Sequence, residues 1–270
     1  MALPRARIMR HVQALVLAAG MGRRLAPLTC ASPKCMLEVN GQRLVELQLD
    51  ALVMAGVARV IVVVGHGAAE VRGYLSESWQ GVPIRYVYNP EYTRTNNIYS
   101  LALAGHHLAE RDTILVECDL VFDPQLMVAA AAASEANLAL VAPHEPWMDG
   151  TVVELDGHGD IARFRLSDEL ERGDHPPYFK TVNIYKLSRA FSHHVFLPAL
   201  QAFMRAHGRN AFYEAVLREM TAHGVARLAA FDASPWRWFE IDTAHDLKSA
   251  RALFAPHSQR LVGAPQQGKW

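Results

Sequence analysis

Residues 14–25 read ALVLAAGMGRRL, an apolar run that passes directly into a loop with two glycines and two arginines. The apolar half predicts a short, buried strand. Because Gly20 and Gly22 carry no side chain, the loop after this strand can bring backbone N–H groups close to a bound phosphate. A strand that leads into such a loop is typical of α/β proteins that bind their ligand at the carboxyl ends of parallel strands.

This loop departs from two common phosphate-binding patterns. The dinucleotide pattern GxGxxG requires a glycine at position 25, where the chain has Leu25. No Walker A sequence occurs either, because no glycine is followed by Lys and then Ser or Thr. Taken alone, the segment is explained as well by an ordinary tight turn as by phosphate binding.

Apolar runs and helical patterns alternate over the first 142 residues. After the strand at 14–17, strands are predicted at 59–64, 84–88, 113–118 and 138–142. The intervals hold a helical stripe that ends at Gly56, helices at 68–75 and 97–108, and a helix that Pro124 opens. This order predicts an α/β fold with a doubly wound, mostly parallel, Rossmann-like sheet.

The pattern changes in the second half of the chain. Strands at 151–155, 161–166 and 179–185 follow one another without long helices, which predicts a small antiparallel insertion or extension of the sheet. The remaining predicted elements are helices at 189–206 and 211–222, strands at 226–231 and 238–241, and a helix at 244–254. We expect a single domain over residues 1–255 and a loose tail at 256–270, where no periodicity remains.

The composition excludes several classes of protein. With 51% hydrophobic and 20% charged residues, the chain is globular rather than disordered. The 27 basic and 27 acidic residues cancel, which argues against a nucleic-acid-binding protein. No apolar run is long enough to span a membrane, and we interpret the apolar stretch after Arg10 as a strand rather than a signal peptide. The three cysteines form no CxxC pattern, which favours reduced thiols and a cytoplasmic protein.

Three groups of polar residues stand where such a fold binds ligands. Lys34 lies near the glycine loop, and because the chain uses five lysines against 22 arginines, it is either a phosphate ligand or a solvated surface lysine. Asp119 and Asp242 each follow a predicted strand, where carboxylates hold Mg²⁺ or cap a helix or turn. Asn96 and Asn97 begin a helix, which they can cap, or they can contact a base or ribose. The sequence contains neither the HExxH pattern of zinc proteases nor the GxSxG pattern of serine hydrolases.

Four segments, in chain order, resemble one enzyme family. LVLAAGMGRRLAPLT, SPKCMLEVNGQRLVE, the strand-end Asp119 and EIDTAHDL together resemble the nucleotidyltransferases that activate sugar phosphates and phosphoalcohols, over about residues 13–254. TNNIYSL and YFKTVNIYKLS look most like the cytidylyltransferases for phosphocholine or 2-aminoethylphosphonate. The resemblance implies a GT-A-like fold, with a nucleotide-binding half at about 13–143 and an acceptor-binding half at about 144–254.

The resemblance also implies a reaction and a set of site residues. An anionic oxygen of the acceptor would attack the α-phosphorus of CTP, with Mg²⁺ bound, and pyrophosphate would leave. The implied catalytic residues are Arg24, Lys34 and Lys180, and the implied Mg²⁺ ligands are Asp119 and Asp242. The implied nucleotide contacts are Leu17, Ala18, Ala19, Gly20, Met21, Gly22, Arg23, Asn96, Asn97 and Ser100. The implied acceptor contacts are Lys180, Asn183, Tyr213 and Glu214.

Two features bear on the acceptor and on the loop. The family often has Ser or Thr where this chain has Arg23, which either adds a phosphate contact or points to solvent. A trimethylammonium acceptor favours an aromatic cage, whereas a primary amine favours carboxylates. The available aromatic residues are Trp147, Tyr213, Trp236 and Trp238, and the available carboxylates are Asp149, Glu154 and Glu214. Because no clear cage emerges, we favour 2-aminoethylphosphonate, with phosphocholine next. The alternatives are a sugar-1-phosphate nucleotidyltransferase and a non-catalytic nucleotide-binding module.

Overall fold

A parallel sheet forms the centre of the molecule. The computed structural model describes residues 12–30, 32–166, 169–170 and 177–255. Within them, four parallel strands lie side by side in the order β7–β1–β4–β6. Their bounds are Val12–Ala18 for β1, Val60–Val64 for β4, Val82–Tyr88 for β6 and Asp112–Glu117 for β7. All four agree with the predicted strands to within two residues, and the predicted α/β class is confirmed.

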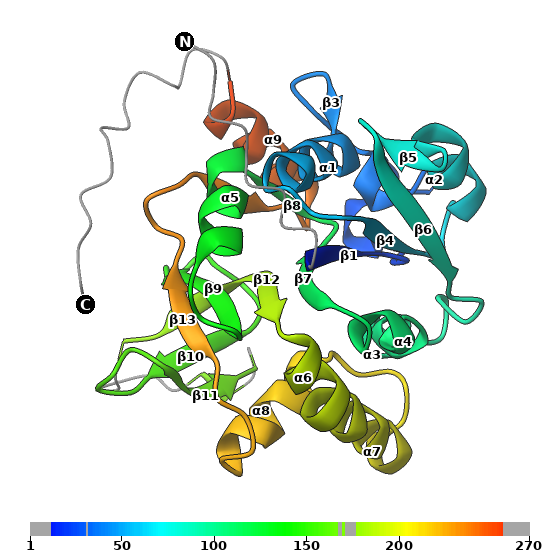
Figure 1. Ribbon diagram of the computed structural model, residues 1–270. Helices are drawn as coiled ribbons and strands as arrows, with labels where there is room; N and C mark the ends of the chain where they lie inside the picture. The colour runs from blue at the N-terminus through cyan, green and yellow to red at the C-terminus, as the bar shows by residue number, and fades with distance from the viewer. Residues whose placement is uncertain (1–11, 31, 167–168, 171–176, 256–270) are drawn as a thin grey trace.

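Helices cover both faces of this sheet (Figure 1). Alternate residues of β1 enter opposite cores: Val16 packs with α1 (Leu44–Met54) and α5 (Pro124–Ala132), whereas Leu15 and Leu17 pack with the helices of the other face. Those helices are α3 (Asn97–Leu103), α7 (Leu197–His207) and α8 (Glu214–Ala222). A strand buried on both faces is mostly apolar, which explains the continuous apolar runs at 14–18 in β1 and at Val60–Val64 in β4.

The predicted antiparallel extension begins at β12 (Phe179–Leu187), which pairs antiparallel with β7. β9 (Leu138–Pro143) pairs along the other edge of β12. β10 (Val152–Leu155) pairs with the first residues of β12 on the edge opposite β9, and β10 continues to β11 (Ile161–Arg165). β13 (Ala229–Asp232) adds to β9. The extension is thus confirmed, but the parallel run is four strands long, because β12 inserts between β7 and the predicted fifth strand, β9.

Several helices differ from their predicted bounds. The helix predicted at 97–108 is two helices, α3 and α4 (Gly105–Leu108). The helix predicted at 189–206 consists of α6 (Arg189–Phe191), a π-helical turn at Ser192–Phe196 and α7. Pro198 lacks an N–H group to donate to the preceding turn, which fits the irregular turn directly before it. α2 (Ala68–Leu75) has the predicted bounds and α9 (Ala244–Leu253) ends one residue early.

Several short strands were missed in the sequence analysis, because two or three residues are too few to show a hydrophobic pattern. They are β2 (Glu38–Val39), β3 (Gln42–Arg43), β5 (Ser78–Trp79) and β8 (Leu120–Phe122). The predicted tail at 256–270 lies outside the described residues. Among the helices that are described, none has both the length and the apolar character that a membrane crossing requires. Cys30, Cys35 and Cys118 are all unpaired.

One short pairing positions the site. β14 (Trp238–Glu240) pairs antiparallel with β8, and the N–H of Ile241 donates to the carbonyl of Asp119 over 2.9 Å. The Arg237 guanidinium fixes this pairing, since its Nη2 lies 2.7 Å from Oδ1 of Asp123 at the end of β8. The Arg237 backbone N–H donates to the other oxygen of Asp123 over 3.0 Å. Residues that follow β7 and β14 are therefore held side by side.

Replacing Arg237 with alanine is expected to lower the free energy of unfolding by about 2–3 kcal/mol, because the change leaves a half-buried Asp123 without its cation. Urea unfolding measures this loss. The matched control is Arg227→Ala: the Arg227 side chain is 76% exposed in its ion pair with Asp160, so its loss is expected to cost less than about 1 kcal/mol. Equal unfolding midpoints for the two variants would show that the Arg237 pair does not hold β14 in place.

Candidate active site

A cleft of about 1020 Å³ opens at the carboxyl ends of β1 and β7. Most of the predicted site residues line it, although they come from segments spread along the whole chain. The predicted residues in its wall are Leu17, Ala19, Gly20, Met21, Gly22, Arg23, Arg24, Lys34, Asn96, Asn97, Ser100, Asp119, Asn183, Glu214 and Asp242. Three predicted residues, Ala18, Lys180 and Tyr213, are absent from that wall and are buried.

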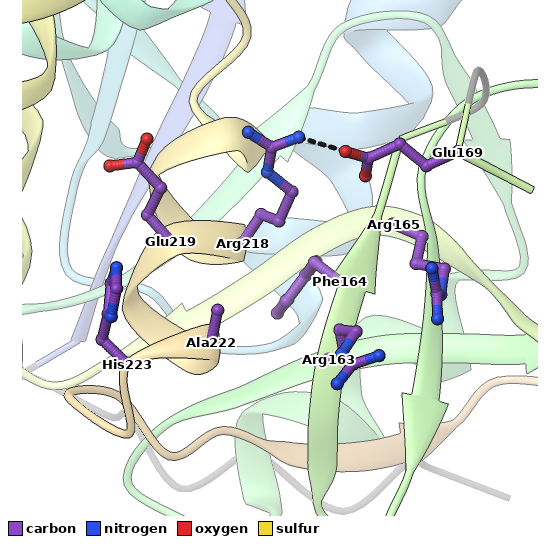
Figure 2. A pocket seen from close by; sticks show the side chains of 8 residues that line it. All are labelled: Arg163, Phe164, Arg165, Glu169, Arg218, Glu219, Ala222 and His223. Carbon is purple, nitrogen blue, oxygen red and sulfur yellow. Dashed lines mark hydrogen bonds and ion pairs between the residues drawn. The ribbon is translucent and has the colours of Figure 1, made fainter.

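A second hollow, of about 530 Å³, shares no lining residue with the cleft. It lies between β11 and α8, and arginines dominate its wall (Figure 2). Two of these arginines already have acidic partners, because Arg218 pairs with Glu169 and Arg165 pairs with Glu154. Two of its three arginines are therefore neutralised, and the hollow carries no concentrated positive charge.

The glycine loop is packed against the segment that carries Lys34. Gly22 has φ 60°, in the left-handed region, and its carbonyl accepts a hydrogen bond from the Thr29 hydroxyl over 2.7 Å. A Cβ atom on Gly22 would lie 3.1 Å from the Thr29 methyl and 3.3 Å from Cβ of Lys34, so only glycine fits without displacing a neighbour. Arg23, at the position where the family often has Ser or Thr, donates to the carbonyl of Thr93 across the cleft over 3.3 Å.

Lys34 joins the two predicted metal-binding aspartates. Its Nζ lies 2.8 Å from Oδ2 of Asp119 and 2.7 Å from Oδ1 of Asp242. Arg24 adds a second cation, with Nη2 2.8 Å from the same oxygen of Asp242 and Nη1 3.4 Å from Asp149. Burial lowers the pKa of the Lys34 ammonium, but attraction and hydrogen bonds from the two aspartates outweigh burial and raise that pKa. For Asp242, burial raises the pKa of the carboxyl group, but the attraction and the hydrogen bond from Lys34 outweigh burial and hold that pKa below its usual value. Lys34 and Asp242 are therefore both charged at neutral pH.

The two aspartates fit a magnesium ion. Their oxygens converge on one cation, the Lys34 ammonium, and Oδ1 of Asp119 is buried without a hydrogen-bond partner in the part of the chain that the structure describes. The same described residues contain no group of three or more His, Cys, Asp and Glu side chains suited to a metal. Mg²⁺ is commonly bound by one or two carboxylates and completed by substrate phosphates and water. Asp119 and Asp242 would hold it in this way, with triphosphate oxygens beside them.

Asn97 has its amide engaged within the protein. Its Nδ2 donates to Oε1 of Glu117 over 3.0 Å, and its Oδ1 accepts from the backbone N–H of Tyr213 over 2.9 Å. Asn96 has the simpler capping role, since its side chain accepts from the N–H of Asn97 over 2.8 Å. The hydroxyl of Ser100 accepts from Asn89 over 3.0 Å. The nucleotide contacts predicted for these residues remain predictions.

Lys180 lies beneath the cleft rather than in its wall. Its side chain is 2% exposed, and its Nζ lies 3.0 Å from Oε2 of Glu240 and donates to the carbonyl of Thr181 over 2.9 Å. A Cβ on Gly150, which lines the cleft, would lie 3.2 Å from this Nζ, so the missing side chain of Gly150 lets the cleft wall pack closely against the ammonium. Asn183 does reach the cleft: it has φ 57° where the register of β12 shifts, and its Nδ2 donates to Oε1 of Glu240 over 2.9 Å. The acceptor contact predicted for Lys180 would have to compete with Glu240.

Three glutamates in the cleft wall have raised pKa values. Burial raises the pKa of Glu214 to about 7, against hydrogen bonds from its own backbone N–H and from Asn97 that lower it. Burial raises the pKa of Glu240 to about 7, although the nearby Lys180 lowers it. Burial, together with repulsion from Asp119 and Glu214, holds the pKa of Glu117 well above its usual range. Perturbed carboxylates that gather in one cleft are typical of functional sites.

The sequence analysis missed Glu117 and Glu240, although a signal for both was present. Each stands two residues before a predicted Mg²⁺ ligand, Asp119 or Asp242. Because side chains alternate along an extended strand, residues two apart point to the same side. The other cleft residues that were missed have no comparable signal: they are Asn89, Tyr92, Thr93, Arg94, Thr95, Cys118, Gly150, Thr151, Leu166, Asn210 and Phe212.

The aromatic residues considered for a cage do not form one. Trp147 is 65% exposed and stacks on Phe239, and Trp236 stacks on Phe231. Tyr213 is fully buried in the core. Of the seven aromatic and acidic candidates for acceptor recognition, the two that line the cleft are both acidic, Asp149 and Glu214.

Comparison with known proteins identifies the class. The family model described as the MobA-like NTP transferase domain matches residues 14–225, and this chain belongs to that family. The family and the relatives found are nucleotidyltransferases, which confirms the predicted resemblance.

Individual relatives carry more specific names. The chain is 35% identical over 264 residues, 96% of its length and 42% of the relative's, to the CMP-5'-(3-aminopropyl)phosphonate synthase of Streptomyces rubellomurinus. It is 42% identical over 112 residues, 42% of its length and 44% of the relative's, to the 2-aminoethylphosphonate cytidylyltransferase of Lancefieldella rimae. It is 39% identical over 98 residues, 36% of its length and 41% of the relative's, to the choline-phosphate cytidylyltransferase of Streptococcus pneumoniae. Each alignment thus spans less than half of the relative.

Solved structures agree on the fold. The CTP:phosphocholine cytidylyltransferase of Streptococcus pneumoniae superposes with a TM-score of 0.75 at 20% identity, covering 90% of this chain and 99% of that one. The inositol-1-phosphate CTP transferase of T. maritima superposes with a TM-score of 0.70 at 21% identity, covering 95% of this chain and 99% of that one. The predicted GT-A-like fold is therefore confirmed.

Proposed function

We propose that this protein transfers CMP from CTP to a small phosphonate or phosphoalcohol that carries an amino or ammonium group, and releases pyrophosphate. 2-Aminoethylphosphonate is the favoured acceptor, with phosphocholine next. The observation that carries the proposal is a cleft with opposite charges in one wall: Arg24 and Lys34 stand by two aspartates, and Glu117 and Glu214 stand nearby. A zwitterionic acceptor and a triphosphate match this distribution. The names of the relatives, two of which contain an aminoalkylphosphonate, support it.

The chain's own residues would act by position and charge. Arg24 and Lys34 would hold the triphosphate and stabilise the negative charge that grows on the departing pyrophosphate. Mg²⁺, held by Asp119 and Asp242, would neutralise phosphate charge and orient the α-phosphorus. No residue needs to act as a general base, because a phosphonate oxygen is already anionic at neutral pH. Such a reaction depends on holding the two substrates in contact more than on a covalent nucleophile.

Partners and location follow from the same proposal. The protein would meet CTP and its acceptor in the cytoplasm and would need neither nucleic acid nor a membrane. The reacting groups of the two proposed substrates, the triphosphate of CTP and the phosphonate of the acceptor, are small anions. The neutral overall charge of the chain fits small-molecule substrates that are recognised locally, by the cleft, rather than by a long-range field.

Pyrophosphate release across a grid of substrates tests the proposal. CTP, UTP, GTP, ATP and dTTP are each combined with Mg²⁺ and with 2-aminoethylphosphonate, 3-aminopropylphosphonate, phosphocholine, glycerol phosphate or a sugar 1-phosphate. We expect release with CTP and an aminoalkylphosphonate. Release confined to a sugar 1-phosphate would contradict the proposal and favour a sugar-nucleotide synthase, while bound nucleotide without any release would favour a non-catalytic module.

A further inference from the structure

Two carboxylates from different parts of the fold meet at one amide. Glu117 ends β7, Glu214 begins α8, and both line the cleft on either side of Asn97 at the start of α3. The carbonyl of the Asn97 amide is occupied by the backbone N–H of Tyr213, 2.9 Å away. The amide is therefore fixed with its N–H groups toward the carboxylates, and Nδ2 donates to Oε1 of Glu117 over 3.0 Å. We call this set of two carboxylates and one amide, Glu117, Glu214 and Asn97, the carboxylate trio.

The carboxylate trio lacks a cation. Glu214 is 5% exposed, and its Oε2 is buried with no hydrogen-bond partner among the residues that the structure describes. Within those residues, neither Glu117 nor Glu214 has an ion pair with Lys, Arg or His. The nearby ammonium of Lys180 is taken by Glu240 at 3.0 Å. Two close, poorly solvated carboxylates repel one another, and a cation between them would relieve that repulsion.

We propose that the carboxylate trio binds the ammonium group of the acceptor and requires its N–H donors, so that it selects a primary amine over a trimethylammonium group. This rests on the proposed cytidylyl transfer. A primary ammonium offers a compact charge and three donors, enough for both glutamates at once. A trimethylammonium group has no N–H and is best held by aromatic faces. The tryptophans Trp147, Trp236 and Trp238 do not line the cleft, and the aromatic residues in its wall are Tyr92 and Phe212.

The position of the carboxylate trio suits a short acceptor. Asp119 follows Glu117 by two residues, a separation of at most about 7 Å along an extended chain. A phosphonate held near Asp119 and Lys34 could therefore reach Glu117 with its amine through a spacer of two or three carbons. Glu117 would face the near side of the ammonium and Glu214, from α8, the far side.

Isosteric acceptors test the selection. In 2-aminoethylphosphonate and propylphosphonate, an ammonium and a methyl group occupy the same position. We expect the wild-type protein to prefer the former in kcat/KM, and also to prefer it to phosphocholine. Glu214→Gln, which keeps shape and removes charge, should lower kcat/KM for 2-aminoethylphosphonate about 30-fold and leave that for propylphosphonate within about twofold. If propylphosphonate turns over too slowly, its inhibition constant serves instead. Glu219→Gln, on the same helix but away from the cleft, should change neither.

The outcomes separate the two proposals. An equal loss with both acceptors, or no loss with either, would overturn the role of the carboxylate trio while leaving cytidylyl transfer in place. So would a wild-type protein that uses phosphocholine as well as 2-aminoethylphosphonate. If the wild-type protein releases no pyrophosphate from CTP with any of these acceptors, the proposed function itself is wrong. Unchanged CTP binding by Glu214→Gln shows that the variant is folded.

Discussion

Replacing Asp119 with alanine will lower the rate of pyrophosphate release at least about 1000-fold and leave the protein folded. Asp119 supplies half of the carboxylate pair that would hold Mg²⁺, and its Oδ1 is a buried acceptor with no partner in the described part of the chain. Removal also frees Lys34 from one of its two anchors, although Asp242, 2.7 Å away, still holds it. The loss should therefore fall on turnover more than on stability.

Steady-state release of pyrophosphate with saturating CTP and acceptor measures this effect, and the circular dichroism spectrum checks the fold. Asp232→Ala is the matched control, because Asp232 ends β13 outside the cleft wall and accepts hydrogen bonds within its own turn, from Ser234. It should keep wild-type turnover. Turnover of Asp119→Ala within tenfold of wild type would overturn the assignment of Asp119 as a metal ligand.

Replacing Lys34 with methionine should have two opposite effects. Turnover should fall at least about 100-fold, because a cation that stabilises the triphosphate is lost. Without nucleotide, however, Mn²⁺ should bind about tenfold more tightly, because the Lys34 ammonium now lies between the two carboxylates, 2.8 Å and 2.7 Å from them, and a metal ion must displace it. Lys34→Arg should not restore turnover, since a planar guanidinium does not replace a compact ammonium.

Electron paramagnetic resonance of free Mn²⁺ gives the metal affinity directly, independently of turnover. The control is Lys248→Met, on the exposed surface of α9, which should alter neither quantity. Weaker or unchanged Mn²⁺ binding by Lys34→Met would show that Lys34 does not compete with metal. The result would leave Lys34 as a phosphate ligand alone.

The parallel half of the fold could be predicted because each of its strands is buried on both faces. Such a strand is recognised from a single run of consecutive apolar residues. RVIVVV at 59–64 has an unambiguous pattern, and so does the loop at Gly20 and Gly22. The insertion of β12 between β7 and β9 could not be predicted, because the paired segments lie far apart in the chain. The hydrophobic pattern of a strand does not indicate which other strand it pairs with.

The candidate site also contains residues that could be predicted and residues that could not. Asp119, Asp242, Lys34 and Arg24 were found through motifs. In the structure Lys34 forms ion pairs with both aspartates, and Arg24 forms one with Asp242. Lys180 was placed in the cleft on the same grounds but is buried, because burial depends on Glu240 and on the β12 backbone, which the motif does not contain. The roles of all these residues remain predictions.

The pairing of β14 with β8 has a consequence for how the chain comes into being. One carboxylate of the proposed metal pair, Asp119, is synthesised 123 residues before the other, Asp242 (242 − 119). A nascent chain could assemble β1, β4, β6 and β7 with their helices while the ribosome was still at work, yet it would hold half of a metal site. Only when β14 docks, fixed by Arg237, do the two aspartates face one another. The proposed metal pair would thus form only after β14 is synthesised, and a chain interrupted between Asp119 and β14 would be inert toward CTP.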